Sequence, residues 1–150
     1  MSNNLDSILL VEDDPNDVVL IRRAFRQANF EPTLTVIQDG DAAIHYFSQL
    51  LENENQPLPE LILLDLKLPR RSGLEVLQWL RQQPRLKRLL IVALTASRES
   101  SDVNKAYEVG INSYLVKPIA FEELVHLVNL INLYWLQLNE KPNTLEDSAR

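Results

Sequence analysis

Residues 61–69 read LILLDLKLP, and this stretch decides the fold. Four consecutive aliphatic residues are typical of a strand buried on both faces, as in a parallel sheet that is covered by helices. The run stops at Asp65, and a carboxylate at the end of a buried strand is costly unless it reaches water or a cation. The stretch therefore predicts a central parallel strand with an acidic residue at its carboxyl end.

Outward from this strand, short apolar runs alternate with longer amphipathic stretches in both directions. Such alternation is typical of βα units around a parallel sheet. We expect an α/β fold of the (βα)5 type with a doubly wound, five-stranded parallel sheet. The strand order 2-1-3-4-5 is taken from known doubly wound folds and not from the sequence. The expected strands are residues 7–11, 34–37, 61–64, 89–94 and 113–116.

Helix signals fall between the expected strands. Asp14 can cap a helix that starts at Pro15, because acidic residues suit the N-cap and proline suits the first turn. Asp39-Gly40 reads as a turn before the second helix. Gly110 can end a fourth helix with a thin apolar face. The remaining expected elements are a loop over 53–60, a third helix ending near Pro84, a last helix over 121–138 and a frayed polar tail over 139–150.

Length and composition are those of one ordinary globular domain. The 150 residues include 45% hydrophobic and 24% charged residues, and we expect a core over about residues 6–138. The net charge of −6 disfavours nucleic acid and anionic membranes as partners. No cysteine is present, and neither a leader nor an apolar run long enough to span a membrane is visible. We expect a cytoplasmic protein.

Polar side chains follow four of the five expected strands. Glu12 and Asp13 follow the first strand, Asp65 the third, Thr95 the fourth and Lys117 the fifth. Open α/β sheets bind their ligands at the carboxyl ends of the strands, where the strand order reverses. Clustered carboxylates repel one another unless a cation occupies the site, and an all-oxygen ligand set favours Mg²⁺. The sequence therefore predicts a magnesium site at this edge of the sheet.

The same edge fits phosphoryl chemistry. Lys117 and Thr95, together with Mg²⁺, would supply three contacts for the oxygens of a phosphoryl group, whose transfer needs positioning and charge neutralisation. A central carboxylate can act as the nucleophile and form an aspartyl phosphate. Asp65 is the candidate, because it follows the most apolar strand and its expected partners flank it.

Four sequence blocks resemble the signatures of two-component response-regulator receiver domains. They are VEDD at 11–14, LDLKLP at 64–69 with Gly73, LTA at 94–96 and YLVKP at 114–118. The resemblance implies the flavodoxin-like receiver fold, Asp65 as phosphoacceptor, and phosphoryl transfer from a sensor histidine kinase. It also implies three Mg²⁺ contacts besides Asp65, which are Asp13 directly, Glu12 through water and the Lys67 carbonyl. It further implies Thr95 and Lys117 as phosphoryl contacts, Tyr114 as an aromatic switch and a cis bond before Pro118.

Two residues depart from the common receiver pattern. Many receivers have Asn or Met two residues after the phosphoacceptor, whereas this chain has Lys67, whose charge can alter the phosphoryl lifetime. The first acidic position is Glu12 where Asp is common. This second change also occurs in the family and should not abolish metal binding.

The last helix suggests how the signal is read out. Residues 139–150 are fewer than a helix-turn-helix module needs, so we expect output through protein contact. A second apolar stripe beside the core stripe widens the apolar arc beyond what one sheet face needs, which favours a homodimer through this helix. The alternative is a wide core helix covered by its own tail. The second stripe consists of Leu127, Leu130, Tyr134 and Leu138.

A short receiver with an extended, aromatic-rich last helix is similar to the cyanobacterial phytochrome-associated response regulators. We expect a switch and not an enzyme. One alternative is a receiver-like scaffold that works without phosphorylation. Another is a phosphohydrolase of the haloacid-dehalogenase type, which would need a second acid where this chain has Lys67.

Overall fold

The computed structural model describes residues 7–143 as a five-stranded parallel sheet in the order β2-β1-β3-β4-β5. Both the fold class and the strand order expected above are confirmed. The strands are β1 (Ser7–Val11), β2 (Thr33–Ile37), β3 (Leu61–Leu64), β4 (Ile91–Thr95) and β5 (Ser113–Val116). The helices are α1 (Pro15–Gln27), α2 (Gly40–Glu52), α3 (Gly73–Gln82), α4 (Ser100–Val109), α5 (Phe121–Ile131) and the π-helix η1 (Asn132–Leu138).

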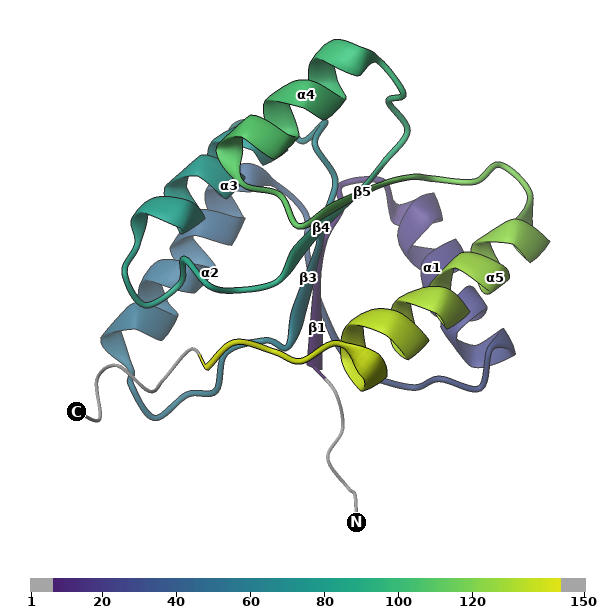
Figure 1. The fold of residues 1–150 in the computed structure, drawn as a ribbon, viewed down its shortest axis with the longest axis horizontal. Coiled ribbons are helices and arrows are strands. Elements are labelled where there is room, and N and C mark those ends of the chain that lie inside the picture. The colour runs from purple at the N-terminus through teal and green to yellow at the C-terminus, as the bar shows by residue number, and fades with distance from the viewer. Residues whose placement is uncertain (1–6, 144–150) are drawn as a thin grey trace.

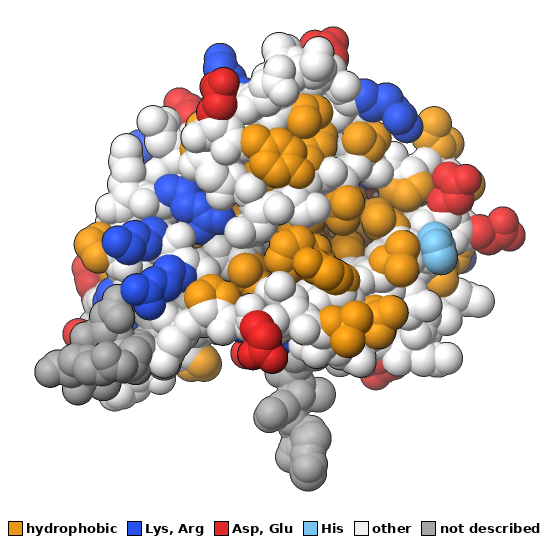
Figure 2. Space-filling view, viewed as in Figure 1, with side chains coloured by type: hydrophobic (Ala, Val, Ile, Leu, Met, Phe, Trp, Pro, Cys, Tyr) orange, Lys and Arg blue, Asp and Glu red, His pale blue; other side chains and the backbone are white. Residues whose placement is uncertain are grey.

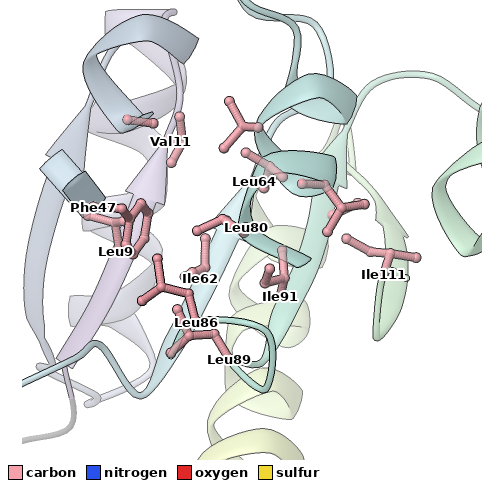
Figure 3. Close-up of a cluster of buried hydrophobic side chains, with 14 of the residues drawn as sticks. Leu9, Val11, Phe47, Ile62, Leu64, Leu80, Leu86, Leu89, Ile91 and Ile111 are labelled. Carbon is pink, nitrogen blue, oxygen red and sulfur yellow. The ribbon is translucent and has the colours of Figure 1, made fainter. Parts of the chain in front are cut away.

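The helices form two layers around the sheet (Figure 1). Helices α1 and α5 cover one face, and α2, α3 and α4 cover the other. Successive side chains of a strand point to opposite faces, so each inner strand contributes to two cores. Leu9, Ile62 and Ile91 pack under α2, α3 and α4 (Figure 3), whereas Leu10 and Leu63 belong to the core under α1 and α5.

Strand β3 lies in the middle of the sheet, and all of its side chains are apolar. All four of its side chains are 0% exposed, and β1 and β4 pair with it on either side. Full burial of one such side chain is worth about 1.5–3 kcal/mol. This buried strand ends at Leu64 and so places Asp65 at its carboxyl end.

The helix starts follow local rules. The Asp14 side chain accepts a hydrogen bond from the Asn16 N–H at 2.9 Å and caps α1. Asp39 lies in the bend between β2 and α2, as the sequence predicts, and it also caps α2 by accepting from the Ala42 N–H at 2.7 Å. A Cβ on Gly40 would lie 1.9 Å from the Arg71 carbonyl oxygen, so only glycine fits this contact.

Helix α4 is the thinly packed helix that the sequence predicts. Ala106 is its one fully buried residue, and no side chain caps its N-terminus. Its C-terminus is anchored instead, because Gly110 adopts a left-handed conformation and its carbonyl accepts from the Arg81 guanidinium at 2.9 Å. The helix is therefore fixed at one end and lightly held at the end near the strand termini.

The last helix spans the expected residues but changes its hydrogen bonding. After Ile131 it continues as a π-helix to Leu138, and the wider turn changes which side chains face inward. Leu136, five residues after Ile131, is buried, while Trp135 is only half-buried. A constant helical period would align Trp135 with Ile131, whereas the π-helix buries Leu136 and leaves Trp135 partly buried against the same core.

Part of the tail lies against the domain. Lys141 forms an ion pair with Glu60 at 2.8 Å, and the Arg88 guanidinium donates to the Asn143 carbonyl at 2.9 Å. The expectation of a frayed tail from residue 139 is therefore wrong for residues 139–143, because these contacts hold it beside the loop before β3. Residues 144–150 lie outside the described residues.

Candidate functional site

Asp65 lies at the carboxyl end of β3, where three groups donate to its carboxylate. The Thr95 hydroxyl donates to Oδ1 at 2.9 Å, the Lys67 backbone N–H donates to Oδ1 at 3.0 Å, and the Lys117 ammonium donates to Oδ2 at 3.0 Å. Asp65 is only 6% exposed, so these donors replace water around a buried charge. The structure thus brings together the three residues that the sequence placed at the ends of β3, β4 and β5.

The acidic pair after β1 joins this cluster. Carboxylate oxygens of Glu12, Asp13 and Asp65 all lie within 4.8 Å of one another. Glu12 is buried, whereas Asp13 is exposed to solvent. The cluster therefore has the shape of an open, acidic cup.

The donor set of this cup fits a hard divalent cation. It offers carboxylate oxygens and no sulfur or imidazole, which is the preference of Mg²⁺. The buried Oε1 atom of Glu12 accepts no hydrogen bond with acceptable geometry among the described residues. The Lys117 ammonium lies 2.6 Å from this atom. The pKa of Glu12 is raised to about 7, mainly because burial penalises its charge.

Lys117 has a further partner that sequence reasoning missed. Its ammonium lies 2.7 Å from the Asp17 carboxylate in the first turn of α1, and also contacts Glu12 and Asp65. Burial opposes the charged lysine, but contacts with Asp17, Glu12 and Asp65 together hold the pKa of Lys117 above its usual range. The available signal was Asp17 itself, an acidic residue in the first turn of the helix after the VEDD block. This signal is weak, because acidic residues are common in the first turn of any helix.

A second network connects the site to α4. The Lys67 ammonium lies 3.5 Å from the Asp102 carboxylate, and Asp102 also accepts a hydrogen bond from the Ser97 hydroxyl. The Tyr114 hydroxyl donates to the Ser97 carbonyl at 2.9 Å. Burial raises the pKa of Tyr114, so its hydroxyl stays protonated. Tyr114 therefore touches the loop between β4 and α4 and does not contact Asp65 directly.

Close backbone packing holds the loop after Asp65. A Cβ on Gly73 would lie 2.3 Å from the Asp65 carbonyl oxygen. The Gly73 N–H donates to the Leu66 carbonyl at 3.0 Å, so the start of α3 packs directly against the loop that follows Asp65. Beside this loop lies a groove of about 480 Å³ lined in part by Asp13, Lys67 and Asp102. The site is therefore open to a ligand on this side.

The expected cis bond before Pro118 is wrong. Every peptide bond among residues 7–143 is trans. A trans bond is the default for proline by about 0.5–1 kcal/mol, and with it the Lys117 ammonium already reaches Asp65. The Lys-Pro pair carries no independent signal for the cis form.

Residues 8–129 match the family described as "Response regulator receiver domain". The chain belongs to this family. It is 42% identical over 135 residues to "Probable methanogenesis regulatory protein FilR2" of Methanothrix harundinacea, covering 90% of this chain and 86% of that protein. It is 40% identical over 136 residues to "Response regulator Rcp1" of Synechocystis sp., covering 91% and 92% of the two chains.

Solved receiver structures have the same fold. The Mn²⁺-bound form of Rcp1 aligns with a TM-score of 0.80 at 39% identity, covering 92% of this chain and 99% of that one. The phosphorylated cyanobacterial phytochrome response regulator RcpA aligns with a TM-score of 0.84 at 34% identity, covering 93% and 99%. This receiver domain is therefore of the response-regulator type, whose members are phosphorylated on aspartate. No helix among residues 7–143 is long and apolar enough to cross a membrane.

Proposed function

We propose that this receiver is a cytoplasmic response regulator that accepts a phosphoryl group on Asp65 with the help of Mg²⁺. The observation that carries the proposal is the environment of Asp65. One hydroxyl, one ammonium and one backbone N–H converge on a carboxylate that also belongs to an acidic metal cup. A phosphoryl group on this carboxylate would meet donors already in place, which is the electrostatic preorganisation that phosphoryl transfer requires.

The chemistry is a transfer between two side chains. A carboxylate oxygen of Asp65 attacks the phosphorus of a phosphohistidine, the P–N bond breaks, and the imidazole leaves. Thr95 and Lys117 bind oxygens of the transferred group. Glu12, Asp13, Asp65 and the Lys67 carbonyl would hold Mg²⁺, which supplies neutralisation of the phosphoryl charge. The protein is a switch, because each transfer adds one phosphoryl group to Asp65. It is not an enzyme that turns over a substrate.

The rival phosphohydrolase function has less support. It would need a general acid two residues after Asp65, where Lys67 directs its ammonium to Asp102. A scaffold that works without phosphorylation would have no use for the buried contacts between Asp65, Thr95 and Lys117.

A docking surface for the histidine donor adjoins the site. Ile119, two residues after Lys117, is fully exposed, and Leu20, one turn after Asp17 on α1, is also exposed. Exposed apolar side chains near the site are available for contact with a partner. We infer that a sensor histidine kinase docks here. A phytochrome-type kinase is the first candidate, since RcpA is described as a phytochrome response regulator.

Transfer measured with two kinds of donor tests this proposal. Ile119→Asp should slow phosphorylation by a phosphorylated phytochrome-type kinase about tenfold, which corresponds to about 1.4 kcal/mol of lost interface energy. Its phosphorylation by acetyl phosphate with Mg²⁺ should be unchanged. The matched control is Tyr107→Asp, which alters an exposed aromatic residue near the far end of α4. Equal slowing by both variants would contradict the docking surface, and failure of both donors on the wild type would contradict the function.

We further propose that output runs through a homodimer formed by α5 and η1. Leu130, Leu133, Tyr134 and Leu138 are exposed there by 47–64%. A groove of about 390 Å³ lies between them and the edge strand β5, lined in part by Leu115, Leu127 and Trp135. Figure 2 shows apolar side chains gathered on this face of the molecule. A second copy offers the same apolar ridge to the same groove, which is the self-complementary geometry of a two-fold dimer.

A further inference from the structure

Lys117 has more partners than phosphoryl binding requires. Its ammonium lies 2.6 Å from Glu12, 2.7 Å from Asp17 and 3.0 Å from Asp65, and its side chain is 15% exposed. The two shortest contacts are to residues other than the phosphoacceptor. The lysine is therefore held at the wall of the site, between α1 and the acidic cup.

One of these contacts conflicts with the proposed metal site. Glu12 belongs to the acidic cup, and in this structure the Lys117 ammonium lies on its buried Oε1 atom. A divalent cation and an ammonium that share one carboxylate repel each other. Lys117 must therefore leave Glu12 before that carboxylate can serve Mg²⁺, and it must stay within reach of Asp65.

Asp17 offers the ammonium a place that meets both conditions. It lies outside the group of carboxylates whose oxygens come within 4.8 Å of one another, and its side chain is 30% exposed at the rim of the site. A lysine held by Asp17 keeps a charged partner after it withdraws from Glu12. The cost of leaving a charge near the interior without a partner is thereby avoided.

We propose that Asp17 is a positioning residue of the phosphorylation site, which draws the Lys117 ammonium off Glu12 and so lets Mg²⁺ bind. This inference rests on the proposed function, because it assumes that the acidic cup holds Mg²⁺. It assigns to α1 a part in the site beyond the capping of a helix.

The simpler role for Asp17 is a favourable charge at the N-terminus of α1. That role is shared by Asp14, whose side chain caps the helix at the Asn16 N–H. Asp14→Asn is therefore a matched control: it removes the same charge at the same helix end, and asparagine caps as well as aspartate does. Of Asp14 and Asp17, only Asp17 forms an ion pair with Lys117 among the described residues.

Mg²⁺ titrations followed by NMR amide shifts test the inference. Asp17→Asn should weaken Mg²⁺ binding on the order of fivefold more than Asp14→Asn, the scale of one partly buried ion pair. Asp17→Glu, which keeps a carboxylate within reach, should restore most of the affinity. In a Lys117→Gln background, Asp17→Asn and Asp14→Asn should weaken binding equally, because no ammonium remains to be moved.

Three results would overturn the inference. Equal losses of Mg²⁺ affinity for Asp17→Asn and Asp14→Asn in the otherwise wild-type protein would mean that Asp17 acts only through its charge at the N-terminus of α1. An excess loss that persists in the Lys117→Gln background would show that Asp17 acts without the lysine. A wild-type protein that binds no Mg²⁺ would overturn this inference and the proposed metal requirement together, whereas the first two results leave the proposed function intact.

Discussion

The hydroxyl of Tyr114 donates a hydrogen bond to the Ser97 carbonyl at 2.9 Å and so ties β5 to the loop before α4. The side chain of the same Ser97 donates to Asp102, which pairs with Lys67, two residues after Asp65. Any movement of Lys67 toward a phosphoryl group would therefore loosen a network that ends at Tyr114. Loosening this network would free the N-terminus of α4, which no side chain caps.

Tyr114→Phe tests this connection. Loss of one hydrogen bond should lower the free energy of unfolding by about 0.5–1.5 kcal/mol. Amide hydrogen exchange should become faster in the β4–α4 loop and in the first turn of α4, while β3 stays protected. Faster exchange throughout the sheet would show that Tyr114 serves general packing instead.

Thr95 is expected to link Asp65 to this loop. Thr95 is fully buried, and its hydroxyl contacts the Asp65 carboxylate. Thr95→Val keeps the shape, removes the hydroxyl and should cost about 1–3 kcal/mol of stability, whereas Thr95→Ser should cost less because the hydroxyl remains. On phosphorylation, NMR shifts at Tyr114 should appear with serine and be lost with valine. Equal shifts in both variants would rule out a role for the hydroxyl.

Much of this architecture follows from the sequence because burial dictates it. The run before Asp65 can only be a central strand, and parallel strands bring their carboxyl ends to one edge, so Asp65, Thr95 and Lys117 meet. The turn expected at Asp39-Gly40 is present as the bend before α2, but the close packing of Gly40 against Arg71 cannot be read from the chain.

The remaining differences have separate causes. A constant helical period would align Trp135 with Ile131, but the wider turn of the π-helix buries Leu136. Asp17 joins the site through an ion pair that spans 100 positions of sequence, which no local motif reports. The cis bond before Pro118 was expected from the family resemblance alone, because nothing in the residues themselves predicts it. The structure has a trans bond there.

Glu12 should make the stability of the metal-free protein depend on pH. Its pKa is about 7 in the folded protein against an ordinary 4.5, so the folded state binds the extra proton between these values. The contribution of Glu12 to stability is therefore full below about pH 4.5 and is lost as the pH rises through 7. The neutral variant Glu12→Gln should gain stability relative to the wild type from pH 5 to pH 8.

Thermal unfolding of both proteins in EDTA at pH 5, 6, 7 and 8 measures this difference. Mg²⁺ should diminish it at pH 8, because the cation compensates the buried charge. A difference between wild type and variant that stays constant with pH would show that Glu12 titrates normally.

The dimer surface can be tested by one charge placed in the apolar ridge. Leu130→Glu should convert a dimer into a monomer in light scattering, because the carboxylate would be buried without a partner at the interface. Val19→Glu is the control, since Val19 is equally exposed but lies on α1. A wild-type protein that is monomeric with and without phosphorylation would contradict the proposed assembly.

The most direct measurement of the central claim is intact-mass spectrometry after incubation with acetyl phosphate. With Mg²⁺ the wild type should gain a single phosphoryl group, and it should gain none in EDTA. Asp65→Asn keeps the shape of the acceptor and should gain none in either condition. A phosphoryl adduct on Asp65→Asn, or a wild type that stays unmodified in Mg²⁺, would contradict the assignment of Asp65 as the phosphoacceptor.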